Sequence, residues 1–198
     1  MVCEEKGIDY ALTETDLGAP EIFAIHPFGK MPVLRHGDFT LCESKAIATY
    51  LDRAFPGPEL IPSDPKHAAL AEQWVSLVNS VMDPTLVRVY LLAHAFPRTA
   101  DGKPNRATID AVLPNVREQL ALLDNTVALT GFLVGDRLTL ADLFVLPILY
   151  YLKRLPESGQ MLDPSTPLGH YHETHAARPS YVRTIPPPGP PRRATPAA

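Results

Sequence analysis

Cysteine is scarce in this sequence, with only Cys3 and Cys42 among its 198 residues. Two cysteines form neither a disulfide framework nor the spacing of a metal site, and such scarcity fits a reducing cytoplasm. Glu4 and Glu5 lie next to Cys3 and disfavour the reactive thiolate that a catalytic cysteine needs. Packing in the core is therefore the preferred interpretation for both cysteines.

Long apolar runs and strong net charge are also missing. The longest strongly apolar run, Leu143 to Leu152, is interrupted by Pro147 and is too short to span a bilayer. Residues 1–6 are acidic and lack the apolar core of a signal peptide. The formal net charge is −4, with acids and bases interspersed, so no basic stripe exists to neutralise phosphates. We therefore expect a cytoplasmic protein that binds neither membranes nor nucleic acid.

The overall composition is ordinary for a globular protein, with 45% hydrophobic and 20% charged residues. A chain of this length can bury a substantial core in one or two domains. Local patterns predict an α+β domain at 1–55, a proline-rich linker at 56–66, an all-α domain at 67–185 and a proline-rich tail at 186–198.

Periodicity and turn residues place the elements of the first domain. In chain order we predict the end of a helix at 1–6 stopped by Gly7, a strand at 9–16, a helical turn at 20–25, a hairpin of strands at 33–34 and 39–42 around His36-Gly37-Asp38, and a helix at 43–55. No strand signal survives after His67. There we predict a long helix at 67–96 kinked at Pro84, one at 105–128 with Pro114 as a kink or late start, one at 139–152, and two short helical pieces between 166 and 185.

Two short motifs flank the predicted hairpin. Met31-Pro32 precedes its first strand, and Glu43-Ser44 follows its second strand and opens the next helix. Ser44 can cap the free backbone amides of that first helical turn, and the same amides can receive a ligand carboxylate. Capping and ligand binding are compatible, so the sequence leaves both interpretations open.

A third motif, Leu138-Thr139-Leu140-Ala141-Asp142-Leu143, is typical of a helix start. Thr139 and Asp142 have the spacing of a capping box, and Leu138 and Leu143 that of a hydrophobic staple. This motif is interpreted as a folding element and not as a site.

Two histidine-containing patterns carry weaker signals. His172 and His175 could share one helix face, but no third ligand accompanies them, so a solvated face is preferred over a metal site. Val87, Tyr90, Leu91 and His94 form a stripe at helical spacing. The stripe could line an apolar substrate pocket or belong to the core of the bundle, and the sequence does not separate the two.

Together these motifs resemble the glutathione transferase family over most of the chain as far as Thr184. The resemblance rests on Cys3 to Asp16, Ile25-His26-Pro27-Phe28-Gly29-Lys30, Met31-Pro32, Glu43-Ser44 and Leu138-Thr139-Leu140-Ala141-Asp142. It implies a thioredoxin-like first domain, glutathione as co-substrate, a small electrophile as second substrate and a homodimer that pairs the site domain of one subunit with the bundle of the other.

The resemblance also assigns roles to residues. It implies a cis Met31-Pro32 bond, with the Met31 backbone holding the tripeptide like an added strand. Ser44 would bind the γ-glutamyl carboxylate, and Glu43 would bind its ammonium group. Lys30 is a second candidate contact for a carboxylate, although a solvated lysine explains its position equally well. No metal ligand is expected.

One part of the family pattern has no counterpart here. The thioredoxin-like fold normally begins with a strand and half a helix, about 20 residues, before the point where this sequence starts. The catalytic Ser, Tyr or Cys of the family would follow that strand, and no residue matches its position. We therefore expect an incomplete first domain and doubtful conjugating activity. The alternatives are a non-catalytic scaffold or ligand-binding protein, or a gene product that begins upstream of Met1.

Overall fold

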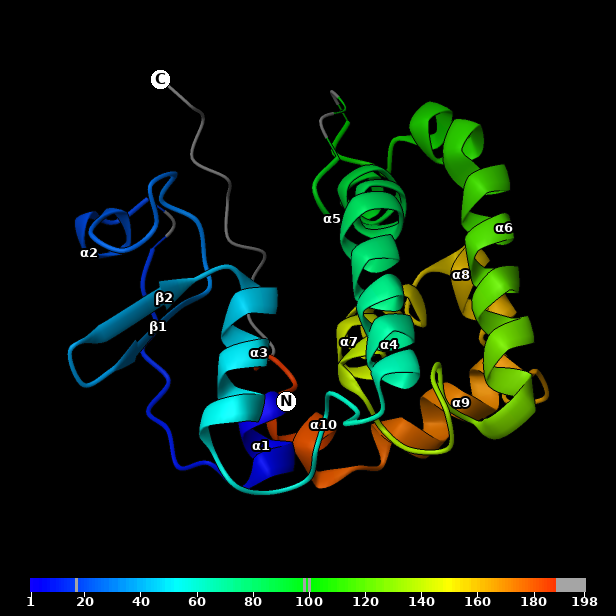
Figure 1. The fold of residues 1–198 in the computed structure, drawn as a ribbon. Helices are drawn as coiled ribbons and strands as arrows, with labels where there is room; N and C mark the ends of the chain where they lie inside the picture. Colours follow the sequence, from blue (N-terminus) through cyan, green and yellow to red (C-terminus); the bar gives the residue numbers. More distant parts are fainter. Residues whose placement is uncertain (17, 98, 100, 188–198) are drawn as a thin grey trace.

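A computed structural model describes residues 1–16, 18–97, 99 and 101–187. A small part with a two-stranded sheet precedes a bundle of helices, and the two lie side by side (Figure 1). The elements of the small part are α1 (Val2–Lys6), α2 (Pro20–Phe23), β1 (Val33–His36), β2 (Phe39–Cys42) and α3 (Ser44–Ala54). The bundle contains α4 (Pro65–Leu77), η1 (Val78–Leu91), α5 (Leu92–Ala95), α6 (Arg106–Thr130), α7 (Leu140–Leu152), α8 (Pro156–Met161), α9 (Pro167–Ala176) and α10 (Pro179–Arg183).

The predicted hairpin is confirmed and forms an antiparallel pair closed by Gly37 and Asp38. Gly37 adopts a left-handed conformation with φ 60°, which a glycine reaches without strain. Val33 pairs with Cys42 at the open end of the ladder, and His36 pairs with Phe39 at the turn. α3 packs against both strands and carries the chain back toward the bundle (Figure 1).

The predicted strand at 9–16 is wrong. Residues 8–16 have no regular secondary structure, and in the described part of the chain no strand lies beside them. The side chains that suggested a strand face solvent: Tyr10 is 44% exposed and Leu12 is 81% exposed. A strand needs a neighbour for its backbone hydrogen bonds, so alternation of apolar residues alone does not produce one here.

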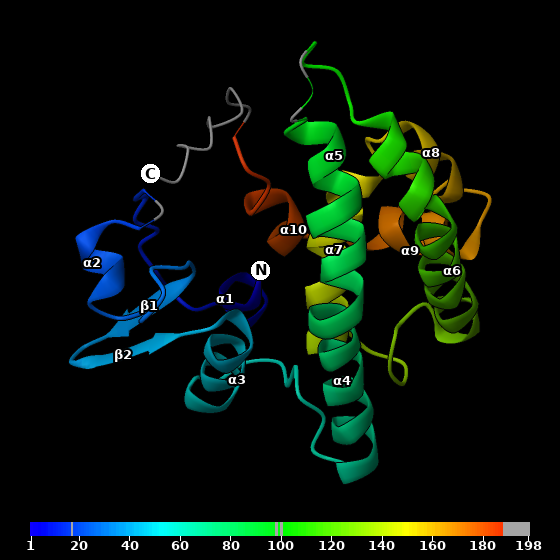
Figure 2. The same ribbon diagram turned by 90° about the horizontal axis from the view of Figure 1, so that it is seen from above.

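The helix predicted across Pro84 is one continuous column made of α4, η1 and α5 (Figure 2). Proline lacks a backbone N–H, and in an α-helix its ring collides with the carbonyl four residues earlier. The chain accommodates Pro84 inside a 14-residue π-type segment, in which hydrogen bonds run over five residues instead of four. The proline therefore changes the winding of the column without ending it.

The other bundle helices agree with the sequence except at one point. α6 begins at Arg106, so Pro114 lies inside the helix and does not delay its start. The capping box is confirmed, because the Asp142 carboxylate accepts the Thr139 backbone N–H at 2.8 Å. Helix α8 was not predicted. The part of the predicted tail that covers residues 188–198 lies outside the described residues.

Helix α1 connects the two parts of the molecule, because it packs against both α3 and α10 (Figure 2). Its consecutive charged residues contact three different segments. Glu4 accepts from Arg183 and Tyr10, Glu5 accepts from Arg178 and Ser180, and Lys6 pairs with Asp52 on α3. A five-residue helix is marginal alone, so these contacts and its packing hold α1 in place.

Within the described residues, no helix combines the length and the apolar character that crossing a membrane requires.

Candidate functional site

The register of the hairpin brings the two predicted site motifs to the same place. Val33 and Cys42 form the last pair of the ladder, so Pro32 and Glu43, the next residue on each strand, leave the sheet side by side. Paired strands lie about 4.8 Å apart. The Met31-Pro32 peptide bond is cis, as predicted. The two motifs therefore form one surface at the open end of the hairpin.

The junction between β2 and α3 has an unusual backbone. Glu43 has φ 71° and ψ 120°, and among the described residues it is the only non-glycine residue with positive φ. It occupies the N-cap position of α3, and Ser44 is the first helical residue. The predicted capping by Ser44 is wrong, because α3 has no side-chain cap hydrogen bond. The first amides of α3 are consequently free to bind a ligand.

All five predicted site residues, Lys30, Met31, Pro32, Glu43 and Ser44, are exposed. The Met31 side chain and backbone are 40% exposed, and the Glu43 side chain is 70% exposed. Exposure of polar groups at the start of a helix is what a site for a charged, peptide-like ligand requires. The structure thus leaves these residues accessible.

His26, on the loop between α2 and β1, was not predicted as a site residue. It is 2% exposed, its Nδ1 accepts the Phe28 backbone N–H at 3.0 Å, and its Nε2 lies 3.1 Å from Glu43 Oε1. The same loop is closely packed at Gly29, which has φ 61° and faces the Phe23 ring so closely that a Cβ would overlap it. A signal in the sequence did exist, because His26 lies in the run that resembles the family.

The stripe on the bundle divides between core and surface. Tyr90 is fully buried, and its hydroxyl donates to Glu157 and accepts from the Ser158 backbone N–H. His94 lies 3.3 Å from the same Glu157 carboxylate, and burial lowers the pKa of its imidazole. Val87 and Leu91 are half-buried. Tyr90 therefore belongs to a polar network inside the bundle and is too buried to line a pocket, whereas His94 lies beside this network with its Nε2 not hydrogen-bonded.

The predicted solvated face of α9 is wrong. His172 is 7% exposed and His175 is 2% exposed. His172 Nε2 lies 3.0 Å from the Tyr181 hydroxyl, and His175 Nε2 lies 3.1 Å from the Gly131 carbonyl oxygen. The helix spacing was correct, but α9 packs between α6, α7 and α10, which turns this face inward. No group of three potential metal ligands is present in the described residues.

The cysteines are half-buried, which is less than the expected core packing. Burial raises the pKa of the Cys3 thiol, which keeps it protonated. The structure therefore gives no support to Cys3 as a nucleophile.

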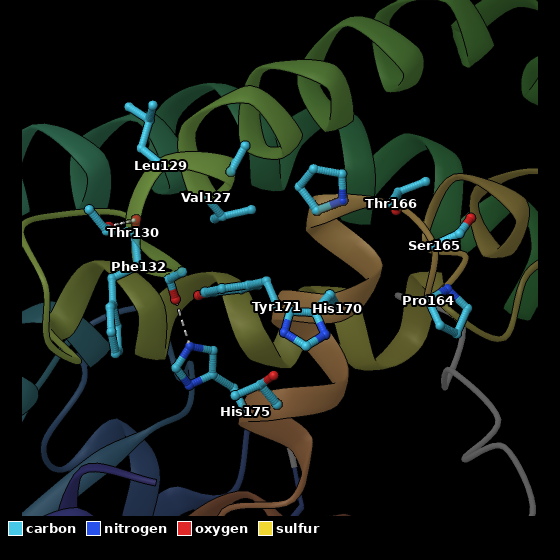
Figure 3. A pocket seen from close by; sticks show the side chains of 14 residues that line it. Val127, Leu129, Thr130, Phe132, Pro164, Ser165, Thr166, His170, Tyr171 and His175 are labelled. Carbon is cyan, nitrogen blue, oxygen red and sulfur yellow. Dashed lines mark hydrogen bonds between the residues drawn. The ribbon is translucent and has the colours of Figure 1, made fainter.

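A cavity of about 690 Å³ lies between the end of α6 and α9 (Figure 3), on the side of the bundle away from the hairpin (Figure 1). In the close view His175 points from α9 toward Gly131 at the end of α6, whereas the Tyr171 hydroxyl donates to Asp142 on α7. The cavity contains none of the predicted site residues: its lining is Val127, Ala128, Leu129, Thr130, Gly131, Phe132, Pro164, Ser165, Thr166, Pro167, His170, Tyr171, Thr174 and His175.

Comparison with known proteins agrees with this architecture. Residues 1–59 match the glutathione S-transferase N-terminal domain, and residues 78–179 match the glutathione S-transferase C-terminal domain. The chain is 31% identical over 193 residues to glutathione S-transferase 3 of Zea mays, covering 93% of this chain and 85% of the relative. It is 29% identical over 195 residues to glutathione S-transferase F13 of Arabidopsis thaliana, covering 94% of this chain and 88% of the relative.

Solved structures show the same fold. The chain superposes on glutathione transferase F7 from Populus trichocarpa with a TM-score of 0.81 at 27% identity, covering 92% of this chain and 88% of that one. A theta class glutathione S-transferase from Xanthomonas axonopodis pv. citri, solved with glutathione bound, gives a TM-score of 0.77 at 27% identity, covering 92% and 87%. The fold is a small thioredoxin-like domain followed by a helical domain. The chain belongs to the glutathione S-transferase family.

Proposed function

We propose that this protein binds glutathione at the open end of the hairpin and transfers its thiol to electrophilic small molecules. The observation that carries the proposal is the register of the hairpin, which places Pro32 beside Glu43 and next to the first amides of α3. Family members solved with glutathione bound support the choice of ligand. Addition of a thiol to an electrophile is detoxification chemistry, and the scarcity of cysteine supports a cytoplasmic location.

Each proposed site residue matches one group of the tripeptide. The Met31 backbone N–H and C=O pair with the ligand backbone as an added strand does. The Ser44 hydroxyl and the first amides of α3 bind the γ-glutamyl carboxylate, where the helix dipole favours negative charge. The Glu43 carboxylate binds the γ-glutamyl ammonium, and Lys30 contacts a second carboxylate. The ligand is thereby held by complementary charges at its ends.

Conjugation also needs a group that lowers the pKa of the bound thiol. We assign that role to no residue of this sequence. The alternative function is therefore a non-catalytic protein of the same fold that binds glutathione or another ligand without transferring it. Both functions share the binding site, so they differ in turnover and not in affinity.

We further propose a homodimer. The site domain of one subunit, residues 1–55, faces the bundle of the partner, residues 67–185. The linker at 56–66 joins the two domains within each subunit. Phe28 supports this arrangement. Phe28 is 75% exposed on the loop that carries His26 and Lys30, which makes it the most exposed aromatic residue in the described part of the chain. An exposed ring beside the site suits an apolar contact with a second subunit.

Calorimetry and a conjugation assay test the function together. Glutathione binding with turnover of a chlorodinitrobenzene supports the transferase, and binding without turnover supports the non-catalytic alternative. Absence of glutathione binding contradicts the transferase and favours a non-catalytic protein that binds another ligand. Ser44→Ala and Glu43→Gln should weaken glutathione binding by about tenfold each, as lost hydrogen bonds to charged groups do. Thr40→Ala, on the exposed face of β2, is the matched control and should bind as the unmodified protein does.

A further inference from the structure

The tautomer of the His26 imidazole follows from its two hydrogen bonds. Nδ1 faces the Phe28 backbone N–H at 3.0 Å, and because a backbone N–H only donates, Nδ1 must be the acceptor. The proton of the neutral imidazole is therefore on Nε2, which points at Glu43 Oε1 at 3.1 Å. His26 donates to the Glu43 carboxylate, and the loop fixes the direction of that donation.

This hydrogen bond joins a buried side chain to an exposed one. The His26 side chain is 3% exposed, whereas the Glu43 side chain is 70% exposed. Within the described residues, His26 supplies the only hydrogen bond to the Glu43 carboxylate, and Oε2 has no partner there. An exposed glutamate otherwise samples several rotamers, and a ligand that uses it must immobilise the side chain.

We propose that His26 is a positioning residue that holds Glu43 in the conformation that receives the ammonium group of a γ-glutamyl ligand. The inference rests on the proposed function, because it assigns a role within the glutathione site. It adds that the site selects ligands with a free amino group at this end. A ligand whose amine is acetylated presents no positive charge to Oε2 and gains nothing from the prearranged carboxylate.

The variant His26→Asn separates this role from the local fold. An asparagine oxygen accepts the backbone N–H two residues ahead, which is the geometry of the His26–Phe28 contact, so the turn is kept. The shorter side chain does not reach Glu43. His26→Gln is the complementary variant, because its longer amide can donate to Glu43 Oε1.

Affinity measured by calorimetry in a double-mutant cycle with Glu43→Gln tests the proposal. His26→Asn should weaken glutathione binding by about threefold to tenfold, the cost of ordering one side chain, and His26→Gln should restore part of the loss. The affinity for N-acetylglutathione should stay unchanged. In the Glu43→Gln background, His26→Asn should have no further effect. Equal weakening for both ligands, or additive effects of the two substitutions, would overturn the proposal.

A nitrogen NMR spectrum of the free protein provides a readout that needs no ligand. It should show His26 as the Nε2–H tautomer, with its Nε2–H resonance shifted in Glu43→Gln. An Nδ1–H tautomer would overturn the inference even if glutathione binds. If the spectrum is as expected but the unmodified protein does not bind glutathione, the proposed function fails and the positioning role fails with it, although the hydrogen bond stands.

Discussion

The Lys6 ammonium and the Asp52 carboxylate form an ion pair of 3.1 Å whose side chains are only 2% and 6% exposed. Lys6 also donates to the Pro58 carbonyl oxygen at 3.0 Å, and Asp52 accepts the backbone N–H groups of Leu60 and Ile61. Lysine is almost never so completely buried unless it is paired. This pair joins α1, α3 and the segment that leads to α4.

We predict that Asp52→Ala lowers the free energy of unfolding by about 3–5 kcal/mol, because Lys6 is left as a buried charge without its partner. Urea denaturation measures the change. Glu59→Ala is the matched control: it breaks an ion pair with Arg137 whose side chains are more than half exposed, and such pairs contribute about 0–1 kcal/mol. Similar losses in the two variants would contradict the prediction.

A second prediction concerns the interior of the bundle. Tyr90→Phe should lower the free energy of unfolding by about 1–3 kcal/mol, because the Ser158 backbone N–H loses its buried acceptor. Burial raises the pKa of the Tyr90 hydroxyl, so at neutral pH the group is protonated and donates to Glu157. Tyr151→Phe, at a position 41% exposed, should change stability little.

The same variant decides between the two interpretations of the stripe on this helix. Tyr90 has no exposed surface, so Tyr90→Phe should leave the affinity for S-hexylglutathione, whose alkyl chain would occupy an apolar substrate pocket, unchanged in calorimetry. A loss of affinity for S-hexylglutathione without a loss of stability would show that Tyr90 lines the substrate pocket.

Elements defined by local chemistry were predictable from the sequence. The Thr139–Asp142 capping box, the hairpin turn at Gly37 and the stop of α1 at Gly7 each depend on residues a few positions apart. The prediction of a strand at 9–16 was wrong because a strand depends on a neighbouring strand, which periodicity in the sequence does not supply. The prediction of a solvated face on α9 was wrong because burial depends on packing between helices that are distant in the sequence.

The candidate site was predictable only in part. Its exposed residues, such as Ser44, came from motifs, whereas the contact between His26 and Glu43 joins residues separated by 17 positions. The positive φ of Glu43 could not be foreseen either, because glycine and asparagine are the residues that usually signal it. Side-chain contacts between a loop and a distant segment can be identified only once the fold is known. The sequence alone provides only the residues that could make them.

The proposed homodimer leads to a third prediction. Phe28→Ala should shift the chain toward the monomer in analytical ultracentrifugation, by about tenfold in the dissociation constant, because the ring loses the apolar surface it would bury. Leu129→Ala, at a residue 84% exposed beside the distant cavity on α6, is the control and should leave the dimer intact. Equal effects of both variants would argue against a specific contact at Phe28.

The last prediction concerns the contact between α1 and the end of the bundle. Arg178 donates to the Glu5 carboxylate at 2.8 Å and 2.7 Å, and Ser180 donates to it as well. Burial alone would raise the pKa of Glu5, but these hydrogen bonds outweigh burial and hold the pKa below its ordinary value. A carboxyl whose pKa is depressed by folding stabilises the folded state above its unfolded pKa, about 4.3 for glutamate.

This contribution is lost as the pH falls through the lower pKa of the folded state. Glu5→Gln should therefore be less stable than the unmodified protein at neutral pH, and the difference should shrink as the pH falls below about 4.3. Urea unfolding across a series of pH values measures both effects. Glu118→Gln removes the same charge from an exposed position on α6 and controls for net charge. A difference between Glu5→Gln and the unmodified protein that stays constant down to acidic pH would show that the Glu5 carboxylate is not stabilised by Arg178 in the folded state.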